Sequence, residues 1–281
     1  MKLRLRDRNG RELGILPINL LDPSFEQPKD DSVLLRRYVD FPKLVDLLIT
    51  KELNLLRMDL LADKYEGRRG RNYEKEVRRE IEKNLAAGGA LLGAQGMTNE
   101  EFAKRWAAQA VHYELLSPQI SFVSCWAMEN DESEALWRIY GAGPAAASLV
   151  VSYAKLRDSI SLDHHLYMGI VNYFDFEAVA DKRPRAMWPL MNKRRQFKYE
   201  SEVRLIKMDE NLRMVDPHYP ARHICRPERP ESIRIGWDVA DHVEKIVISP
   251  YAHTWQQDLI RQTVARLCPG LEARVVDSIM R

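Results

Sequence analysis

The chain has 281 residues, of which 45% are hydrophobic and 30% charged, and its formal net charge is +2. These values are typical of a globular protein with a substantial core, and the overall charge does not require a nucleic acid or a membrane surface as a partner. No run approaches the roughly 20 apolar residues of a membrane span. The three cysteines are widely spaced, and the first ten residues have no apolar stretch. We therefore expect reduced thiols, no membrane and a cytoplasmic location.

The first part of the chain predicts a hairpin, a strand and an amphipathic helix. Residues 1–31 form the hairpin extension, with Asn9-Gly10 as its turn. A strand follows at residues 32–39, and the helix begins near Pro42. Residues 53–69 then predict a short strand that runs into a loop.

Residues 70–116 differ in composition, because they are rich in Glu, Lys, Arg and Ala with apolar residues at helical spacing. The pattern predicts helices at 72–85 and 99–115. The sequence from Thr98 to Glu101 resembles a helix cap with acidic residues in the first turn. We expect these helices to form an insertion beside a sheet.

Strands dominate the rest of the chain. They are predicted at 118–127, 146–154, 165–176, 196–207, 232–239, 243–250 and 272–279, with helices at 131–143, 155–160 and 254–269. The strand at 232–239 is expected to pair with the one at 196–207. Because several strands follow one another without full helices between them, we predict a single α+β domain over residues 1–281. Its sheet should be mainly antiparallel and split into two halves that face a cleft.

The strand predicted at 196–207 raises a chemical question. Alternation places Glu200 and Glu202 on one face, about 6.5–7 Å apart, together with Lys198 and Arg204. Like charges so close together repel each other. The pair is either an exposed face neutralised by the two cations or part of a site that uses both carboxylates, with Arg204 bracing them.

Other polar residues also interrupt apolar strands. Arg36 and Arg37 lie in one, and Ser124 lies in another. Each taken alone has an ordinary structural explanation. His164 and His165 are adjacent rather than four residues apart, so we predict no metal site. Phosphate-binding glycine loops and the G-x-S-x-G elbow are absent from the sequence.

Taken in order, an arginine, a strand serine and a Glu-x-Glu element resemble the Arg-Ser-Glu class of ADP-ribosyltransferases. The resemblance implies that NAD is a co-substrate. It assigns catalysis to Glu202, Glu200 and Ser124. Glu202 would hold the ribose and stabilise its developing positive charge, and Ser124 would orient this carboxylate. For this to hold, Ser124 and Glu202 must lie on the same side of the sheet.

The same resemblance implies how NAD is bound. Arg37 is chosen over Arg36 as the phosphate ligand because it directly precedes a tyrosine. Tyr38, Trp126 and Tyr140 would stack on the nicotinamide or adenine ring.

A second resemblance covers nearly the whole chain. The motifs LRRY, ADKYEG, SCWA, LWRIYG, FKYESEVRL, EKIVISP and VVDSI follow one another in the sequence. Together they resemble the bacterial family called domain of unknown function 2971. That family implies no settled activity, so it supports a layout rather than a reaction.

Three functions remain open from the sequence. The first is an NAD-dependent ADP-ribosyltransferase or glycohydrolase, acting as a bacterial toxin or anti-phage effector on a protein or nucleic-acid acceptor. The sequence leaves open whether an antitoxin controls it. The second is an RNA- or DNA-binding or RNA-targeting protein without NAD chemistry, suggested by the basic blocks at 68–79 and 182–198. The third is a non-catalytic sensor or interaction domain.

Overall fold

The computed structural model describes residues 4–6, 12–15, 25–87, 96–141, 143–160, 166–181, 187–208 and 230–281. Its main sheet has nine strands. They are β3 (Leu34–Asp40), β4 (Glu52–Arg57), β5 (Ser121–Met128), β6 (Ala146–Ser152), β7 (Leu166–Ile170), β10 (Glu202–Met208), β11 (Ser232–Gly236), β12 (Lys245–Ile248) and β13 (Val275–Asp277). Only β12 and β13 pair in parallel among these strands. The described part of the chain is therefore α+β with a mainly antiparallel sheet, as predicted.

The sheet forks at β5. One edge of β5 pairs with β10 along its length, and β10 in turn pairs with β7. The other edge is shared between two strands. Its first residues pair with β4, through Leu56 and Val123, and its last residues pair with β3, through Arg36 and Ala127. Because β3 and β4 diverge between these two contacts, an opening forms beside the middle of β5.

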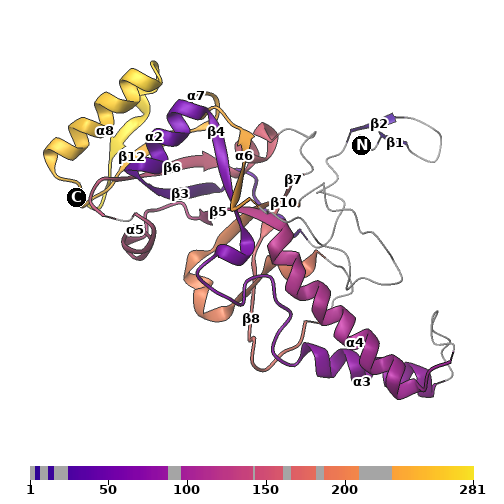
Figure 1. The fold of residues 1–281 in the computed structure, drawn as a ribbon. Helices are drawn as coiled ribbons and strands as arrows, with labels where there is room; N and C mark the ends of the chain where they lie inside the picture. The colour runs from indigo at the N-terminus through magenta and orange to yellow at the C-terminus, as the bar shows by residue number, and fades with distance from the viewer. Residues whose placement is uncertain are drawn as a thin grey trace.

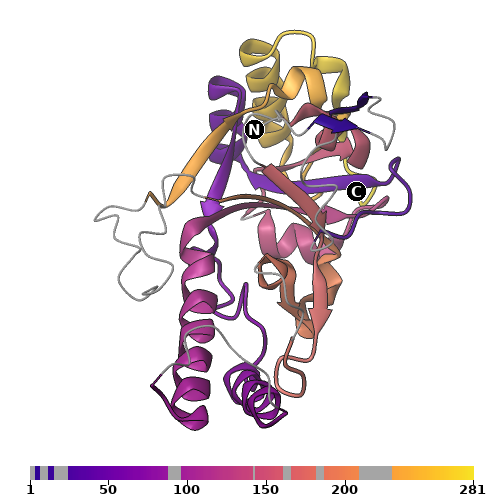
Figure 2. The same ribbon diagram turned by 90° about the vertical axis from the view of Figure 1, so that its right-hand side faces the viewer.

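Helices cover one face of the sheet. They are α2 (Phe41–Thr50), α6 (Tyr153–Ser159), α7 (Val239–His242) and α8 (Thr254–Leu267). Apolar residues of all four pack into the largest core cluster, which also holds Leu35, Trp126 and Leu205 from the sheet. Figure 1 shows α2, α7 and α8 together on this side, and Figure 2 shows the same layer above the strands.

Local sequence explains where α2 begins and ends. The Asp40 side chain accepts a hydrogen bond from the backbone N–H of Lys43, and Pro42 lies in the first turn, where its missing N–H costs nothing. The helix ends at Lys51, whose φ of 55° is left-handed. Strand β3 therefore ends where α2 begins, and β4 begins directly after α2 ends. These two fixed boundaries help to define the fork.

The opposite face carries shorter elements. They are η1 (Met58–Leu60), α5 (Glu134–Tyr140), η4 (Trp188–Met191), η5 (Arg195–Glu200) and a two-stranded parallel sheet of β8 (Asn172–Phe174) and β9 (Asn192–Arg194). Two separate small cores form here. One lies around Leu136 and Trp137, and the other lies around Met58 and Leu190. Polar residues fill the space between these two cores.

Two helices extend from this region, as predicted. They are α3 (Tyr73–Ala86) and α4 (Asn99–Leu116), and η2 (Ser117–Ile120) connects α4 to β5. Both figures show the pair projecting away from the sheet. Arg69 anchors their base, because its backbone N–H donates to Glu114 and its guanidinium donates to the carbonyl of Asp181.

The N-terminal hairpin is also observed. Strand β1 (Arg4–Arg6) pairs antiparallel with β2 (Glu12–Ile15). The predicted turn at Asn9-Gly10 lies outside the described residues. Among the described residues, no helix is both long and apolar enough to cross a membrane.

Two strand predictions are wrong. Residues 196–207 do not form one strand, because Arg195–Glu200 is a 3-10 helix and Ser201 adopts a left-handed φ of 42° before β10 begins. This break lets the side chain of Glu200 turn inward to a buried lysine. Strand β11 pairs with β4 and not with β10, whose edges are taken by β5 and β7.

Candidate functional site

A cavity of about 370 Å³ lies at the fork of the sheet. All seven residues that the sequence predicted for the site line it, namely Arg37, Tyr38, Ser124, Trp126, Tyr140, Glu200 and Glu202. The register of the strands shows that these residues come from both faces of the sheet. The cavity therefore reaches both faces through the opening between β3 and β4.

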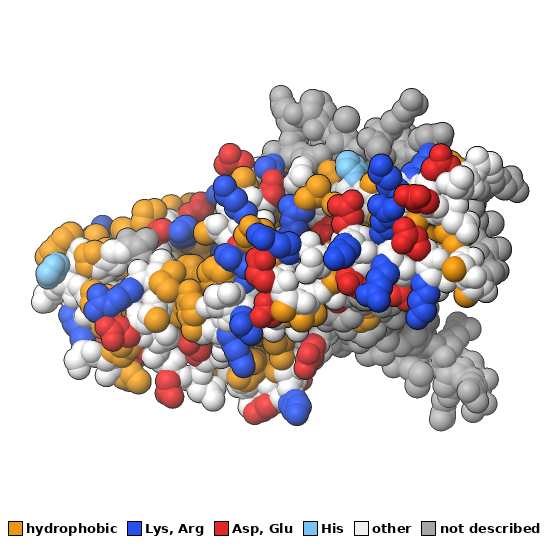
Figure 3. All heavy atoms as spheres, turned by 90° about the horizontal axis from the view of Figure 1, so that it is seen from below, with side chains coloured by type: hydrophobic (Ala, Val, Ile, Leu, Met, Phe, Trp, Pro, Cys, Tyr) orange, Lys and Arg blue, Asp and Glu red, His pale blue; other side chains and the backbone are white. Residues whose placement is uncertain are grey.

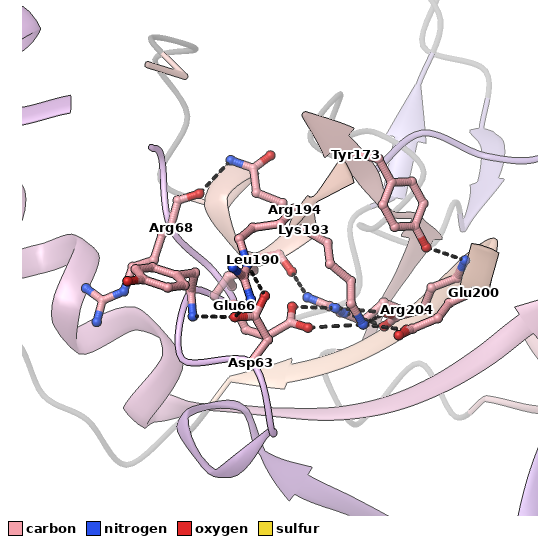
Figure 4. Close-up of polar contacts among 12 residues, drawn as sticks. Asp63, Glu66, Arg68, Tyr173, Leu190, Lys193, Arg194, Glu200 and Arg204 are labelled. Atoms are coloured by element: carbon pink, nitrogen blue, oxygen red, sulfur yellow. Dashed lines mark hydrogen bonds and ion pairs between the residues drawn. The ribbon is translucent and has the colours of Figure 1, made fainter. Parts of the chain in front are cut away.

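A buried cluster of five charged side chains forms one wall. Its members are Glu66, Lys193, Glu200, Glu202 and Arg204, none more than 8% exposed. Arg204 donates from Nε and Nη2 to the two oxygens of Glu202, at 2.6 and 3.0 Å, and from Nη2 to Glu66 at 2.8 Å. Lys193 Nζ lies 3.1 Å from both Glu66 and Glu202 and also pairs with Glu200. Figure 4 shows Lys193 and Arg204 converging on these carboxylates.

Backbone geometry brings this cluster together from distant segments. Glu66 precedes Gly67, whose φ of 73° is left-handed and whose missing Cβ leaves room for Pro118 and Met58. Lys193 comes from β9, while Glu202 and Arg204 alternate onto one face of β10. The prediction that Arg204 braces the carboxylates holds for Glu202 but not for Glu200, because the second carboxylate that Arg204 contacts is Glu66.

Glu202 is saturated by its neighbours. Burial alone would raise its pKa, but Arg204 and Lys193 outweigh burial and lower the pKa to about 2. The Cys125 thiol also donates to this carboxylate. Because a carboxylate offers about four acceptor positions, these contacts leave no position free for a ribose hydroxyl. The geometry therefore argues against the predicted role of Glu202 as the ribose ligand.

Glu200 is held differently. It accepts a hydrogen bond from Tyr140 Oη at 2.9 Å and pairs with Lys193 rather than with the predicted Lys198 or Arg204. Burial raises its pKa, which Lys193 partly offsets. A carboxylate with a raised pKa and fewer partners is better suited to proton transfer than Glu202.

Ser124 does not orient the catalytic carboxylate as predicted. In the register of β5 and β10, Ser124 lies opposite Leu205, whereas Glu202 lies opposite Ala127. Residues directly opposite share a face and neighbours alternate, so Ser124 and Glu202 point to opposite sides of the sheet. The Ser124 hydroxyl instead accepts a hydrogen bond from the indole of Trp126 at 3.1 Å. The Arg-Ser-Glu geometry is therefore not formed in its usual arrangement.

The choice of Arg37 over Arg36 is also corrected by register. Arg36 and Glu202 both lie opposite Ala127, from the two edges of β5, so Arg36 is the arginine on the carboxylate face. Arg37 points the other way, with its guanidinium 5.8 Å from the Trp126 ring centroid and donating to the carbonyl of Asn54 at 3.2 Å. Burial lowers the pKa of Arg37 to about 10.

Arg36 is buried with unused donors. It is 8% exposed, and its Nη2 donates to the carbonyl of Asn130 at 2.9 Å. Its Nε and Nη1 have no hydrogen-bond partner among the residues that the structure describes. A buried guanidinium with open donors that lines a cavity is suited to binding an anion.

The three predicted aromatic residues differ in access to the cavity. Trp126 is 1% exposed and packs edge-on against Trp237, and Tyr38 packs edge-on against Trp137. Both are held within cores, so neither is placed to stack on a ligand. Tyr140 is 42% exposed and remains available.

Sequence reasoning missed Glu66 and Lys193 as site residues. Glu66 belongs to the motif ADKYEG, which gave a signal, but its pairing with Arg204 joins residues 138 positions apart. Lys193 was assigned to a basic block. Among the described residues of this block, Arg194 pairs with Asp63, Arg195 pairs with Asp175, and Lys193 lies in the buried cluster.

Two arginines of the other basic block are also paired. Arg71 pairs with Glu177, and Arg78 pairs with Glu82 and Glu100. Figure 3 shows acidic and basic side chains intermixed on the face that it presents, not gathered by sign. Intermixed charges give little attraction for a polyanion, so this face of the described chain does not favour nucleic-acid binding.

Metal ligation has no support in the described residues, which hold no group of three or more His, Cys, Asp or Glu side chains suited to an ion. Comparison with known proteins found no matching family model, no similar curated protein and no similar solved structure. The resemblance to the domain of unknown function 2971 family stays a prediction.

Proposed function

We propose that this protein is an enzyme that cleaves the nicotinamide–ribose bond of NAD and transfers the ADP-ribose to an acceptor or to water. The observation that carries this proposal is the position of Arg36. Arg36 lines the same cavity as Glu200 and Glu202, shares a sheet face with Glu202, and has two guanidinium nitrogens without a partner in the described chain. Across two strand spacings, Arg36 and Glu202 are about 10 Å apart at the backbone. A ligand with an anionic part and a sugar would place its anion at Arg36 and its sugar at Glu200, which lines the same cavity.

The chemistry assigns separate roles to the two ends of the cavity. Arg36 binds the diphosphate. As the C1′–N bond breaks, its electron pair leaves with the nicotinamide nitrogen, and positive charge develops on the ribose. Glu200 stabilises this charge. The acceptor then forms a bond to C1′ and gives its proton to Glu200.

The remaining charged residues position Glu200. Lys193 pairs with Glu200, and Glu202 and Glu66 hold Lys193 in place. Burial alone would lower the pKa of Lys193, but Glu202 and Glu66 outweigh burial and raise it, so the ammonium stays charged. The Arg-Ser-Glu likeness does not support this proposal, because Ser124 and Glu202 lie on opposite sides of the sheet. The proposal rests instead on Arg36 and Glu200, which line one cavity. The nine strands form one branched sheet and not two separate halves, so the fold adds no support for the Arg-Ser-Glu class.

An assay of nicotinamide release tests the proposal. Purified protein is incubated with NAD, and nicotinamide and ADP-ribose are quantified by chromatography. We expect turnover that falls about 100- to 1000-fold in Glu200→Gln. Glu134→Gln changes an exposed glutamate outside the cavity lining and serves as the matched control. Binding of NAD without any release of nicotinamide would favour the non-catalytic sensor instead.

Growth of cells that express the protein tests the effector role. We expect the wild-type protein to arrest growth and Glu200→Gln to be tolerated at equal abundance. Equal toxicity of both proteins would remove NAD chemistry from the explanation of growth arrest.

A further inference from the structure

Asn54 lies at the centre of the fork and has an unused acceptor. Its Oδ1 is buried and accepts no hydrogen bond from any residue that the structure describes. A buried amide oxygen without a partner costs free energy, so such atoms are uncommon unless a ligand completes them. Asn54 lines the same cavity as Arg36 and Glu200.

Strand register places Asn54 on the functional face. Leu56 lies opposite Val123 of β5, and Asn54 alternates onto the same side as Leu56. Val123 is four residues before Ala127, which lies opposite Glu202, so both pairs face the same way. Asn54 therefore shares its face with Arg36 and Glu202.

Neighbouring strands fix the backbone of Asn54. On one edge it lies opposite Arg234 of β11, and on the other its carbonyl accepts a hydrogen bond from Arg37 at 3.2 Å. Arg37 thus bridges the opening between β3 and β4. This arrangement holds the backbone of Asn54 in position before any ligand arrives, which reduces the entropy lost on binding.

We propose that Asn54 is a specificity residue that accepts a hydrogen bond from an N–H group on an aromatic ring of the ligand, beside the anion bound by Arg36. The inference rests on the proposed function and deepens it. Arg36 has hydrogen-bond donors without partners in the described chain, and Asn54 has an acceptor without a partner there. A ligand that satisfies both would carry an anion together with an amino or carboxamide group. In NAD, this group is either the carboxamide of nicotinamide or the 6-amino group of adenine.

Calorimetry with dinucleotide analogues tests the inference and distinguishes these two sources. Glu200→Gln is the host protein, so that the ligand is not consumed. The probes are NAD, nicotinic acid adenine dinucleotide, which lacks the carboxamide N–H, and nicotinamide hypoxanthine dinucleotide, which lacks the 6-amino group. We expect the host to bind one analogue about 10-fold more weakly than NAD, because a buried acceptor is left unpaired.

Substitutions at Asn54 complete the test. Asn54→Leu should weaken NAD binding and abolish the preference, whereas Asn54→Asp keeps an acceptor and should retain the preference. Asn72→Leu, the same change at an exposed asparagine outside the lining, should behave like the host. Without ligand, Asn54→Leu should raise the urea midpoint of unfolding, because an unpaired buried oxygen is removed.

Two results would overturn the inference while leaving the proposed function standing. One is equal binding of all three dinucleotides, and the other is a preference that survives in Asn54→Leu. A lower urea midpoint for Asn54→Leu would show that Oδ1 already has a partner and would also overturn it. If no dinucleotide binds at all, the proposed function fails together with the inference.

Discussion

Arg204 and Glu202 form a two-pronged ion pair within the sheet, at 2.6 and 3.0 Å, with Arg204 wholly buried and Glu202 2% exposed. Such a pair is costly to desolvate and stabilises the fold only while both partners remain charged. Glu66 and Lys193 extend it into a network that links three segments of the chain. The main role that the structure supports for Glu202 is therefore to hold the two cations, and Glu200 is the carboxylate that remains for chemistry.

Glu202→Gln should destabilise the protein. The substitution leaves Arg204 and Lys193 with one carboxylate fewer, and breaking a buried pair typically costs about 3–5 kcal/mol. Urea unfolding measures this as a fall in the free energy of unfolding. Glu134→Gln, which alters an exposed pair with Arg138, should leave the midpoint unchanged. A Glu202→Gln protein as stable as the wild type would show that the network contributes nothing to folding.

Acid should weaken the fold through the same residue. The pKa of Glu202 is about 2 in the folded protein and has an ordinary value of 4.5. A lowered carboxyl pKa contributes stability above the unfolded value, and this contribution is lost as the pH falls from about 4.5 to 2. The shift corresponds to about 3 kcal/mol. Glu200 acts in the opposite direction, because its pKa is raised and its buried charge is relieved by protonation.

Unfolding in urea at a series of pH values between 7 and 3 checks this linkage. We expect the wild type to lose stability steeply below pH 4.5. Glu202→Gln starts lower and should show a shallower loss. Parallel curves for the two proteins would assign the acid sensitivity to other groups.

Tyr140→Phe should change the pH dependence of turnover. The lost hydroxyl donates to Glu200, so its removal raises the pKa of this carboxylate further. If ionised Glu200 is the active form, the acid limb of the pH–rate profile moves to higher pH. Tyr199→Phe, a nearby exposed tyrosine, is the control. An unshifted limb in Tyr140→Phe would remove Glu200 from the titration that limits the rate.

The sequence pattern correctly predicted features that depend only on neighbouring residues, namely two helices and one contact within a strand. The helices expected at 72–85 and 99–115 are observed at Tyr73–Ala86 and Asn99–Leu116, because composition and caps act within a few turns. The contact between Arg204 and Glu202 also followed from alternation, since both residues lie on one short strand.

The sequence could not predict which face of the sheet a residue occupies or which distant residue it contacts, because strand register and long-range pairing determine both. The face of Ser124 depends on its pairing with Leu205, which lies 81 positions away. Glu200 leaves the strand pattern because it turns towards Lys193, a contact that no periodicity encodes. The same limit explains why Arg37 was chosen over Arg36, whose face is defined only by its pairing with Ala127.

Replacing three arginines by methionine, one at a time, should affect stability and NAD binding in three different ways. The variants are Arg36→Met, Arg37→Met and Arg204→Met. Arg36 has buried donors without partners in the described chain, so its removal should leave the free energy of unfolding unchanged or raise it. Binding of NAD should weaken about 10- to 100-fold, as expected for charge-assisted hydrogen bonds to phosphate. Arg204→Met should instead destabilise the protein by about 3–5 kcal/mol, because it leaves Glu66 and Glu202 without their main cation.

Arg37→Met is the decisive comparison, because Arg37 lies next to Arg36 in sequence but on the other face of the sheet. Its guanidinium contacts Trp126 and the carbonyl of Asn54, so its loss should lower stability. The phosphate contacts of Arg36 remain, and NAD affinity should fall less than in Arg36→Met. Calorimetry and urea unfolding on the same three proteins measure both quantities. A larger loss of affinity in Arg37→Met would restore Arg37 as the phosphate ligand and move the binding site to the face of the sheet that carries α2.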